Sequence, residues 1–348
     1  MEKWYNDINM DEHIIISCRC RLARNIKKYP FSIMLKDEGA AAVIKEAAHS
    51  IKSERSPLSP YFEYIDVNNL TALEKQALVN KHIISPEFIK TNNKKGLLVK
   101  DDESCSIMLN EEDHIRIQTI FSGDNMEKAW DMADKIDNLI EESIEFAFDK
   151  DYGYLTSCPT NTGTGLRASY MVHIPLLEKT GQFRNIVQAI GKFGMTARGI
   201  YGEGTESMGS IYQISNQVTL GKTEQEIIKS LQGVTHQIIE QENKLREKMI
   251  QEKNYIVEDM IYRAYGILSN CRKISGKEAI KLLSDVRLGY MTGILKTRKP
   301  KHNIYSIIMN IQPGLLQFNY GKEISDDERD VLRARYIRDK FDYTDYSQ

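Results

Sequence analysis

The stretch IIISCRCRLARN, residues 14–25, carries two cysteines and three arginines. In a β-strand every second side chain points to the same side. One face then collects Ile14, Ile16, Cys18, Cys20 and Leu22, and the other collects Ser17, Arg19 and Arg21. We expect the cysteines to pack as small apolar groups, because C-x-C without nearby histidine or further cysteine is a poor zinc site. The arginines would hold phosphate oxygens, or lie on a solvated edge strand. This stretch alone leaves both interpretations open.

The stretch NEEDHIRIQ, residues 110–118, places Arg116 on one strand face with His114 and Gln118, just beyond three acids. A carboxylate beside an arginine-lined anion site suits a base that acts on a cationic group while an anion is transferred. The alternative is an acidic hairpin tip without a chemical role.

Two glycine-rich loops also carry reactive side chains. In CPTNTGTGLRAS, residues 158–169, Gly163 and Gly165 would let the backbone approach a ligand, and Arg167 follows directly. This loop matches neither the G-x-x-x-x-G-K-[ST] phosphate loop nor the dinucleotide fingerprint. Its Cys158 is either an activated thiolate or a structural cysteine. In ARGIYGEGTES, residues 197–207, Arg198 and Glu203 lie among three glycines, which is typical of an active-site flap or of an ordinary surface loop.

The elements that position these residues follow from periodicity. Residues 106–110 and 114–121 form a predicted hairpin, and 209–217 contain a short strand. Helices are predicted over 36–54, 71–83, 126–148, 223–253, 255–270, 275–295 and 326–341, the second with a capping box from Thr71 to Glu74. The fold class is therefore α+β, with a mainly antiparallel sheet flanked by helices over 1–245. A small all-helical domain follows over 246–348.

Composition narrows the class of protein. The 348 residues include 47 Lys+Arg and 49 Asp+Glu, so the basic excess of a dedicated nucleic-acid binder is missing. No apolar run approaches the ~18 residues that span a bilayer, and residues 1–13 do not read as a signal peptide. Five scattered cysteines indicate reduced thiols. We expect a cytoplasmic protein with no nucleic-acid or membrane partner.

Taken in order, these segments resemble the guanidino (phosphagen) kinase family. The motifs that carry the resemblance are Ser17-x-Arg19-x-Arg21, NEEDHIRI at 110–117, CPTNTGTG at 158–165, and the loop from Arg198 to Glu203. RDVLRA, residues 329–334, is similar to the R-D-x-x-R-A element of the bacterial protein arginine kinases (McsB type), which the chain resembles from end to end. Thr162 stands where the family commonly has leucine. Creatine and arginine kinases carry an all-helical domain before the first motif, whereas 16 residues precede Ser17 here. We expect a site open enough for an arginine on a protein.

The resemblance implies that MgATP and a protein arginine give ADP and phosphoarginine. Glu112 matches the catalytic carboxylate, Glu203 a second acid near the guanidinium, and Cys158 the thiol against it. The arginines would neutralise the transferring phosphoryl group and ADP, and Mg²⁺ would arrive with the nucleotide rather than in a protein cage. The implied ATP-binding positions are Ser17, Cys18, Arg19, Cys20, Arg21, His82, Arg116, Arg167, Ala168, Ser169, Tyr170, Met171, Arg198, Gly199, Ile200, Tyr201, Gly202 and Glu203.

The C-terminal motif has two interpretations. Ser325 and Glu328 form a predicted capping box, and Arg329 and Arg333 share a helix face. They either pair with Asp326 and Asp330 on a solvated face or, as the resemblance implies, help to recognise phosphoarginine. The phosphoarginine-binding pocket would comprise Arg329, Asp330, Arg333 and Ala334.

Two rival functions stay open: a kinase of free arginine, and an inactive phosphoarginine-binding scaffold. Glu112, Glu203 and the five arginines weigh against the scaffold, because an inert binder needs no pair of acids. The resemblance also implies several partners. These are misfolded proteins and a stress-gene repressor as substrates, a zinc-binding activator protein, a Clp unfoldase and protease, and further copies of the chain.

Overall fold

The computed structural model describes residues 3–91, 93–200, 207–252, 255–297 and 299–341. The chain divides into two compact units, which we describe separately. Unit 1 contains Met1–Trp4, Ser17–Ser169 and Ser215–Gln232. Unit 2 contains Tyr5–Ile16, Tyr170–Ile214 and Gly233–Gln348.

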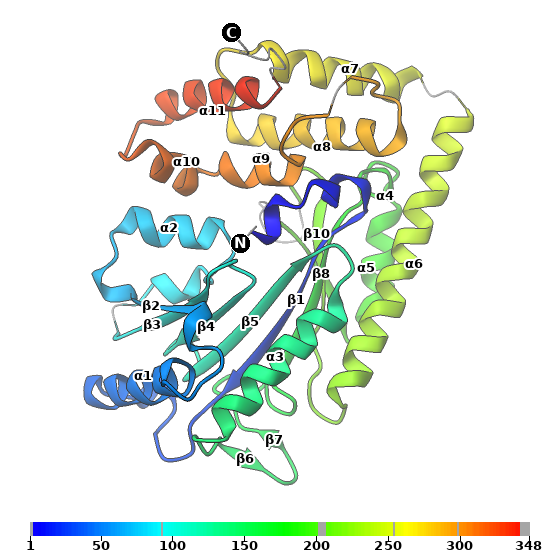
Figure 1. The fold of residues 1–348 in the computed structure, drawn as a ribbon. Helices are drawn as coiled ribbons and strands as arrows, with labels where there is room; N and C mark the ends of the chain where they lie inside the picture. Colours follow the sequence, from blue (N-terminus) through cyan, green and yellow to red (C-terminus); the bar gives the residue numbers. More distant parts are fainter. Residues whose placement is uncertain (1–2, 92, 201–206, 253–254, 298, 342–348) are drawn as a thin grey trace. The chain divides into compact units, whose positions relative to one another are not determined.

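The main sheet has eight strands in the order β2-β3-β4-β5-β1-β8-β10-β9, and β6 and β7 form a small separate pair (Figure 1). The predicted hairpin is confirmed, because β4 and β5 pair antiparallel. The strands are β1 (Ile15–Arg24), β2 (Phe62–Asp66), β3 (Gly96–Lys100), β4 (Cys105–Leu109), β5 (Ile115–Ser122), β6 (Phe148–Asp149), β7 (Gly153–Tyr154), β8 (Leu166–His173), β9 (Met195–Gly199) and β10 (Ile211–Asn216).

Strand β1 has two chemically different faces, as its alternation predicts. Cys18 and Cys20 are 1% and 0% exposed, and the Cys20 sulfur lies 3.5 Å from that of Met126 in helix α3 (Met126–Glu141). Burial raises the pKa of the Cys18 thiol to about 12, so it stays protonated. The prediction that these cysteines pack as apolar groups is confirmed.

Two helices of unit 1 pack against the sheet and against each other. α3 contacts β5, and α1 (Asp37–Lys52) contacts β2, β3 and β4. The Thr119 hydroxyl of β5 donates to the Ala129 carbonyl of α3 over 2.7 Å. The prediction carried α3 to residue 148, but the helix ends at Glu141 and the chain then turns toward β6.

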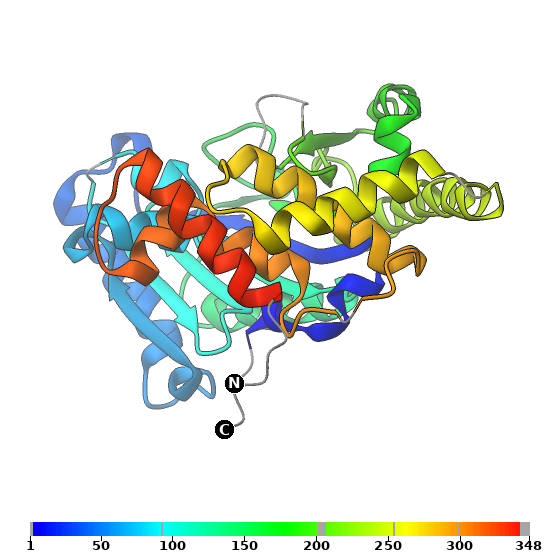
Figure 2. The same ribbon diagram turned by 90° about the horizontal axis from the view of Figure 1, so that it is seen from above.

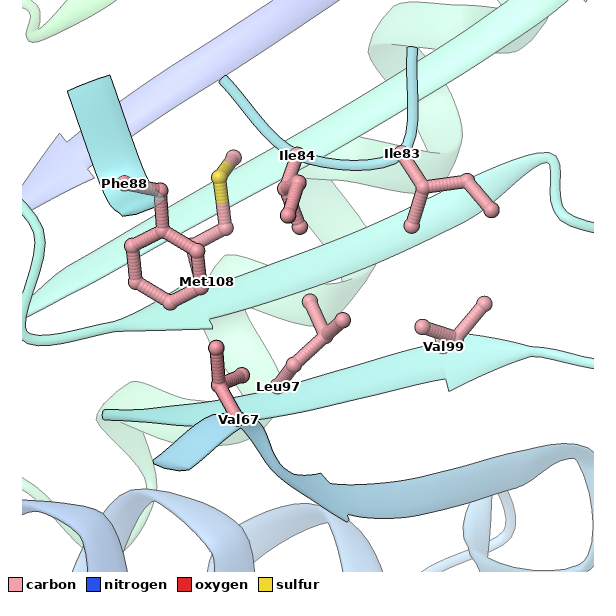
Figure 3. Packing of buried hydrophobic residues seen from close by; sticks show 7 residues of the cluster. All are labelled: Val67, Ile83, Ile84, Phe88, Leu97, Val99 and Met108. Carbon is pink, nitrogen blue, oxygen red and sulfur yellow. The ribbon is translucent and has the colours of Figure 1, made fainter. Parts of the chain in front are cut away.

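A compact apolar cluster anchors the segment that follows helix α2 (Ala72–Asn80), whose predicted capping box is confirmed. In Figure 3, Ile83, Ile84 and Phe88 from this segment face side chains of β3 and β4. Leu97 pairs with Met108 in the sheet register, and Met108 pairs with Arg116 of β5, so these residues share one face. Unit 1 therefore has one continuous face that is apolar at β3–β4 and arginine-rich at β5–β1.

Unit 2 is mainly helical. α7 packs against α8 and α11, and Figures 1 and 2 show these helices side by side. The predicted helices near 255, 275 and 326 are confirmed. The helices of this part of the chain are α4 (Pro175–Lys179), α5 (Gln182–Gly191), α6 (Glu224–Gln251, which begins in unit 1), α7 (Tyr255–Asn270), α8 (Gly276–Thr292), α9 (Ile304–Asn310), α10 (Pro313–Tyr320) and α11 (Asp326–Phe341).

A buried ion pair holds the early part of the chain within unit 2. Arg287 of α8 lies 3.0 Å from the Asp11 carboxylate and also donates to the carbonyls of Met10 and His13. The second Asp11 oxygen accepts from the Ile304 amide at the start of α9. Charges taken out of water need such partners, so residues 10–13 are firmly bound to α8 and α9.

Two further predictions concern the chain as a whole. Within the described residues, no helix is both long and apolar enough to span a membrane. The proposed domain boundary near residue 245 falls inside α6, which is continuous over Glu224–Gln251, and it stays a prediction.

Candidate active site on the arginine face of the sheet

Arg19 and Arg21 of β1 and Arg116 of β5 lie on the same face of unit 1. Arg21 pairs with Gln118 in the register, and Ala23 pairs with Arg116, so Arg116 is the diagonal neighbour of Arg21. Arg167 comes from the start of β8, the other neighbour of β1. Sequence periodicity placed Arg19 and Arg21 on one strand face, and the structure brings Arg116 and Arg167 within electrostatic range of Arg21.

The electrostatics of this cluster favour an anionic ligand. Burial and the positive charges of Arg19, Arg116 and Arg167 lower the pKa of Arg21, and the Glu111 charge opposes them. Among the described residues, Arg21 Nε is buried without a hydrogen-bond partner. Several guanidinium groups held together in this way repel one another unless an anion such as phosphate lies among them.

The two adjacent glutamates of the β4–β5 turn have different environments. Glu111 is buried, forms an ion pair with Arg116 and accepts a hydrogen bond from the Ser85 hydroxyl. Glu112 is exposed, and the Cys158 side chain lies near enough to its carboxylate to favour the charged form. Partial burial of its carboxylate and the charges of Asp113 and Glu111 raise the pKa of Glu112, against the effect of Arg116. Glu112 is thus the acid that remains accessible to a substrate.

A buried aspartate fixes this turn against the Cys158 loop. Asp113 accepts from the Asn25 side-chain amide and from the Ser157 amide, each over 2.7 Å. Asn25 in turn accepts from the His114 amide over 2.9 Å. Sequence reasoning assigned no role to Asn25, Asp113 or Glu111. Glu111 and Asp113 belong to the motif NEED, whereas no pattern in the sequence singled out Asn25.

The glycines of the Cys158 loop lie close to the backbone of neighbouring segments. Gly165 has φ +66°, and a Cβ there would lie 2.7 Å from the Ala23 carbonyl of β1. Gly163 has φ +115°, and its Cβ would meet the Thr219 carbonyl at 2.5 Å. Only glycine fits such positions, so the backbone approach expected toward a ligand is here an approach to neighbouring backbone.

His82 lies at the edge of this face. His82 has a backbone φ of +60°, and the Gln118 side chain donates to the His82 carbonyl over 2.7 Å. Burial and the nearby positive charge of Arg19 lower the pKa of His82 to about 3, so the imidazole is neutral at physiological pH.

The other predicted nucleotide-site residues have different settings. Ser17 is buried, whereas the side chains of Cys18 and Cys20 lie on the opposite, α3-facing side of β1. Ala168, Ser169, Tyr170 and Met171 are buried in β8. Arg198 is exposed in β9 of unit 2, followed by the partly exposed Gly199 and Ile200. Tyr201, Gly202 and Glu203 lie outside the described residues.

The C-terminal motif forms ion pairs on α11. Arg329 pairs with Asp326, and Arg333 pairs with Asp330. Arg333 is only 3% exposed and also donates to the Ile274 carbonyl over 2.9 Å, so this part of the face is not solvated. The Ser325 hydroxyl accepts from the Glu328 amide, which is one half of the predicted capping box, and Ala334 is buried.

A metal centre is the alternative to an anion site. In the part of the chain that the structure describes, His, Cys, Asp and Glu side chains form no group of three that could hold a metal ion. The arginine cluster is suited to anions instead.

Comparison with known proteins agrees with this geometry. The family model of the ATP:guanido phosphotransferase C-terminal catalytic domain matches residues 42–245, and that of the protein-arginine kinase McsB C-terminal domain matches residues 254–348. A protein-arginine kinase of Caldanaerobacter subterraneus subsp. tengcongensis is 49% identical, covering 95% of this chain and 97% of that protein. A protein-arginine kinase of Bacillus subtilis is 44% identical, covering 98% of this chain and 93% of that protein.

A solved structure shows the same fold. The crystal structure of lombricine kinase superposes with a TM-score of 0.60 at 25% identity and covers 67% of each chain. The sheet, the arginine face and both family models thus lead to one conclusion. The chain belongs to the ATP:guanido phosphotransferase family and, within it, to the protein-arginine kinases.

Proposed function

We propose that this chain transfers the γ-phosphoryl group of MgATP to the guanidinium of arginine residues in proteins. The observation that carries the proposal is the pairing of two features in unit 1. Four arginines lie within electrostatic range of one another, and the accessible Glu112 lies in the turn beside them. The names of the relatives support arginine in a protein as the acceptor.

The arginine face would bind the polyphosphate. Arg19, Arg21, Arg116 and Arg167 offer forked donors to its oxygens and neutralise the charge that develops as the terminal P–O bond breaks. By its position in the family motif, Arg198 is also assigned to phosphate binding. Mg²⁺, carried by the nucleotide, would add charge neutralisation at the phosphates.

Glu112 would receive the proton. A guanidinium has a pKa above 12 and becomes a nucleophile only when its charge is engaged and a proton leaves. As the new P–N bond forms, one N–H proton passes to the Glu112 carboxylate, and ADP departs with the electrons of the broken P–O bond. Glu203 would hold the same guanidinium, and Cys158 would orient Glu112 through its S–H donor.

The acceptor decides between this proposal and its closest rival. ATP turnover is measured with casein and with free L-arginine under the same conditions. We expect turnover that depends on casein and is saturable in it. Turnover that depends only on free arginine would assign the chain to the small-molecule kinases, and no turnover with either would favour the scaffold.

We further propose that the C-terminal motif binds phosphoarginine. Arg333 lies beside the N-terminus of α8, because a Cβ on Gly276 would sit 3.6 Å from its guanidinium. Helix N-termini favour anions, so a phosphoryl group would displace Asp330 and bridge Arg333 to α8, with Arg329 at the rim. An Arg329→Ala/Arg333→Ala variant should lose phosphoarginine binding in calorimetry. Unchanged binding would contradict this role.

The remaining expectations concern partners. By resemblance, we propose that phosphorylated proteins, including a stress-gene repressor, are delivered to Clp proteolysis, that a zinc-binding protein activates the kinase, and that it acts as a homo-oligomer in the cytoplasm. Degradation assays with and without the kinase test the first point. Unchanged degradation of a phosphorylated substrate would contradict it.

A further inference from the structure

Residues Lys3 and Trp4 lie in unit 1, next to His82, and no function above accounts for them. Trp4 is 6% exposed. Its indole centre lies 6.5 Å from the centre of the His82 imidazole, with 46° between the planes. Buried aromatic pairs at this separation restrict each other's ring orientation.

A charged network holds Trp4 in place. Lys3 Nζ lies 3.0 Å from the Glu103 carboxylate and donates to the Asp101 carbonyl over 2.8 Å. The same Glu103 carboxylate lies 3.1 Å from Lys81 Nζ, and Lys81 directly precedes His82. Lys3 directly precedes Trp4 and Lys81 directly precedes His82, so the Glu103 carboxylate holds the residues before both rings.

The main chain of His82 is fixed independently of Trp4. Gln118 donates to the His82 carbonyl, and Ile83 and Ile84 belong to the apolar cluster of Figure 3. Gln118 is also the register partner of Arg21, so this loop is tied to the arginine face. The contact with the indole therefore concerns the imidazole ring of His82 and not its backbone.

We propose that Trp4 is a positioning residue for the nucleotide site: it orients the His82 ring toward the uncharged base and ribose of the nucleotide, beside Arg19. This inference rests on the proposed function, because it assumes that the arginine face holds the phosphates. A neutral ring suits the uncharged part of a nucleotide, whereas the arginines suit its phosphates.

The first test separates binding from chemistry. Trp4→Ala should raise the Kd for MgADP and the KM for ATP about 3- to 10-fold, the range expected for one aromatic contact, and change kcat less than about twofold. Trp4→Phe, which keeps an aromatic ring, should restore most of the affinity. Wild-type affinity in a folded Trp4→Ala protein would overturn the proposal.

The second test does not require the alanine variant to fold. The chain has two tryptophans, Trp4 and Trp130, and Trp130 lies on α3. In a Trp130→Phe protein, Trp4 is the sole tryptophan reporter. MgADP should change its emission with the midpoint that calorimetry gives, and His82→Ala should abolish the change. Calorimetric binding without an emission change would overturn the role of Trp4 and leave the proposed function intact. No calorimetric binding would contradict the proposed function itself.

Discussion

The Cys158 thiol lies beside the Glu112 carboxylate and acts to lower its pKa, while the adjacent Glu111 carboxylate forms an ion pair with Arg116. Two neighbouring acids of the same type are thus given different tasks by their surroundings. One is placed to accept a proton, and the other holds an arginine of the anion site.

This difference predicts unequal effects of two conservative substitutions. Glu112→Gln should lower kcat about 100-fold or more, because the proton acceptor is lost, with little change in nucleotide affinity. Glu111→Gln should act through Arg116 and change the Kd for MgADP more than kcat. Steady-state kinetics and calorimetry measure both, with the exposed Glu63→Gln of β2 as a matched control. Near-normal turnover in Glu112→Gln would remove Glu112 from the mechanism.

Cys158→Ala should shift the acidic limb of the kcat–pH profile to higher pH. The Cys158 thiol favours the charged form of Glu112, so its removal raises that pKa further. A base works in its deprotonated form, and therefore activity would be lost at a higher pH as the solution is acidified. The profile is recorded with wild type and variant, and an unmoved limb would show that the thiol does not act through Glu112.

Asp113 should matter for stability and for catalysis together. Asp113→Ala leaves the Asn25 amide and the Ser157 amide without their shared acceptor, which costs about 2 kcal/mol when such groups stay buried. The turn that carries Glu112 would also lose its attachment to the Cys158 loop. Urea unfolding and kcat are compared with those of Asp151→Ala, an exposed aspartate. A variant with wild-type stability and wild-type kcat would contradict this anchoring role.

Sequence reasoning was most successful where periodicity and motifs act locally. The strand alternation of β1 predicted the buried Cys18 and Cys20 and the common face of Arg19 and Arg21, because a two-residue period needs no knowledge of the fold. The capping box at Thr71 was predicted for the same reason.

Contacts between distant segments were beyond the sequence. Asn25 meets Asp113 across 88 positions, and Trp4 meets His82 across a similar gap, so neither pair leaves a local pattern. The helix at Met126 was predicted too long, because apolar residues continue after Glu141 where the chain has already turned. The sequence also did not distinguish Glu111 from Glu112, since only the folded turn brings Arg116 to one and Cys158 to the other.

Three histidines with lowered pKa values predict loss of stability in acid. The pKa of His82 is lowered to about 3 and those of His114 and His173 are also lowered, all chiefly by burial. The unfolded state therefore binds more protons below about pH 6.5, and stability falls as the pH is lowered from there toward the folded-state values. Urea unfolding at pH 7.5 and pH 5 measures this loss. His82→Gln should reduce it by on the order of 1 kcal/mol, and an unchanged pH dependence would contradict the neutral, buried imidazole.

The central claim is that the arginine face and Glu112 phosphorylate arginine in proteins. The most direct measurement is mass spectrometry of casein after incubation with the protein and MgATP, worked up without acid because the P–N bond is acid-labile. We predict phosphoarginine with the wild-type chain and its loss with Glu112→Gln. The absence of phosphoarginine with the wild-type chain, with or without an activator protein, would contradict the account.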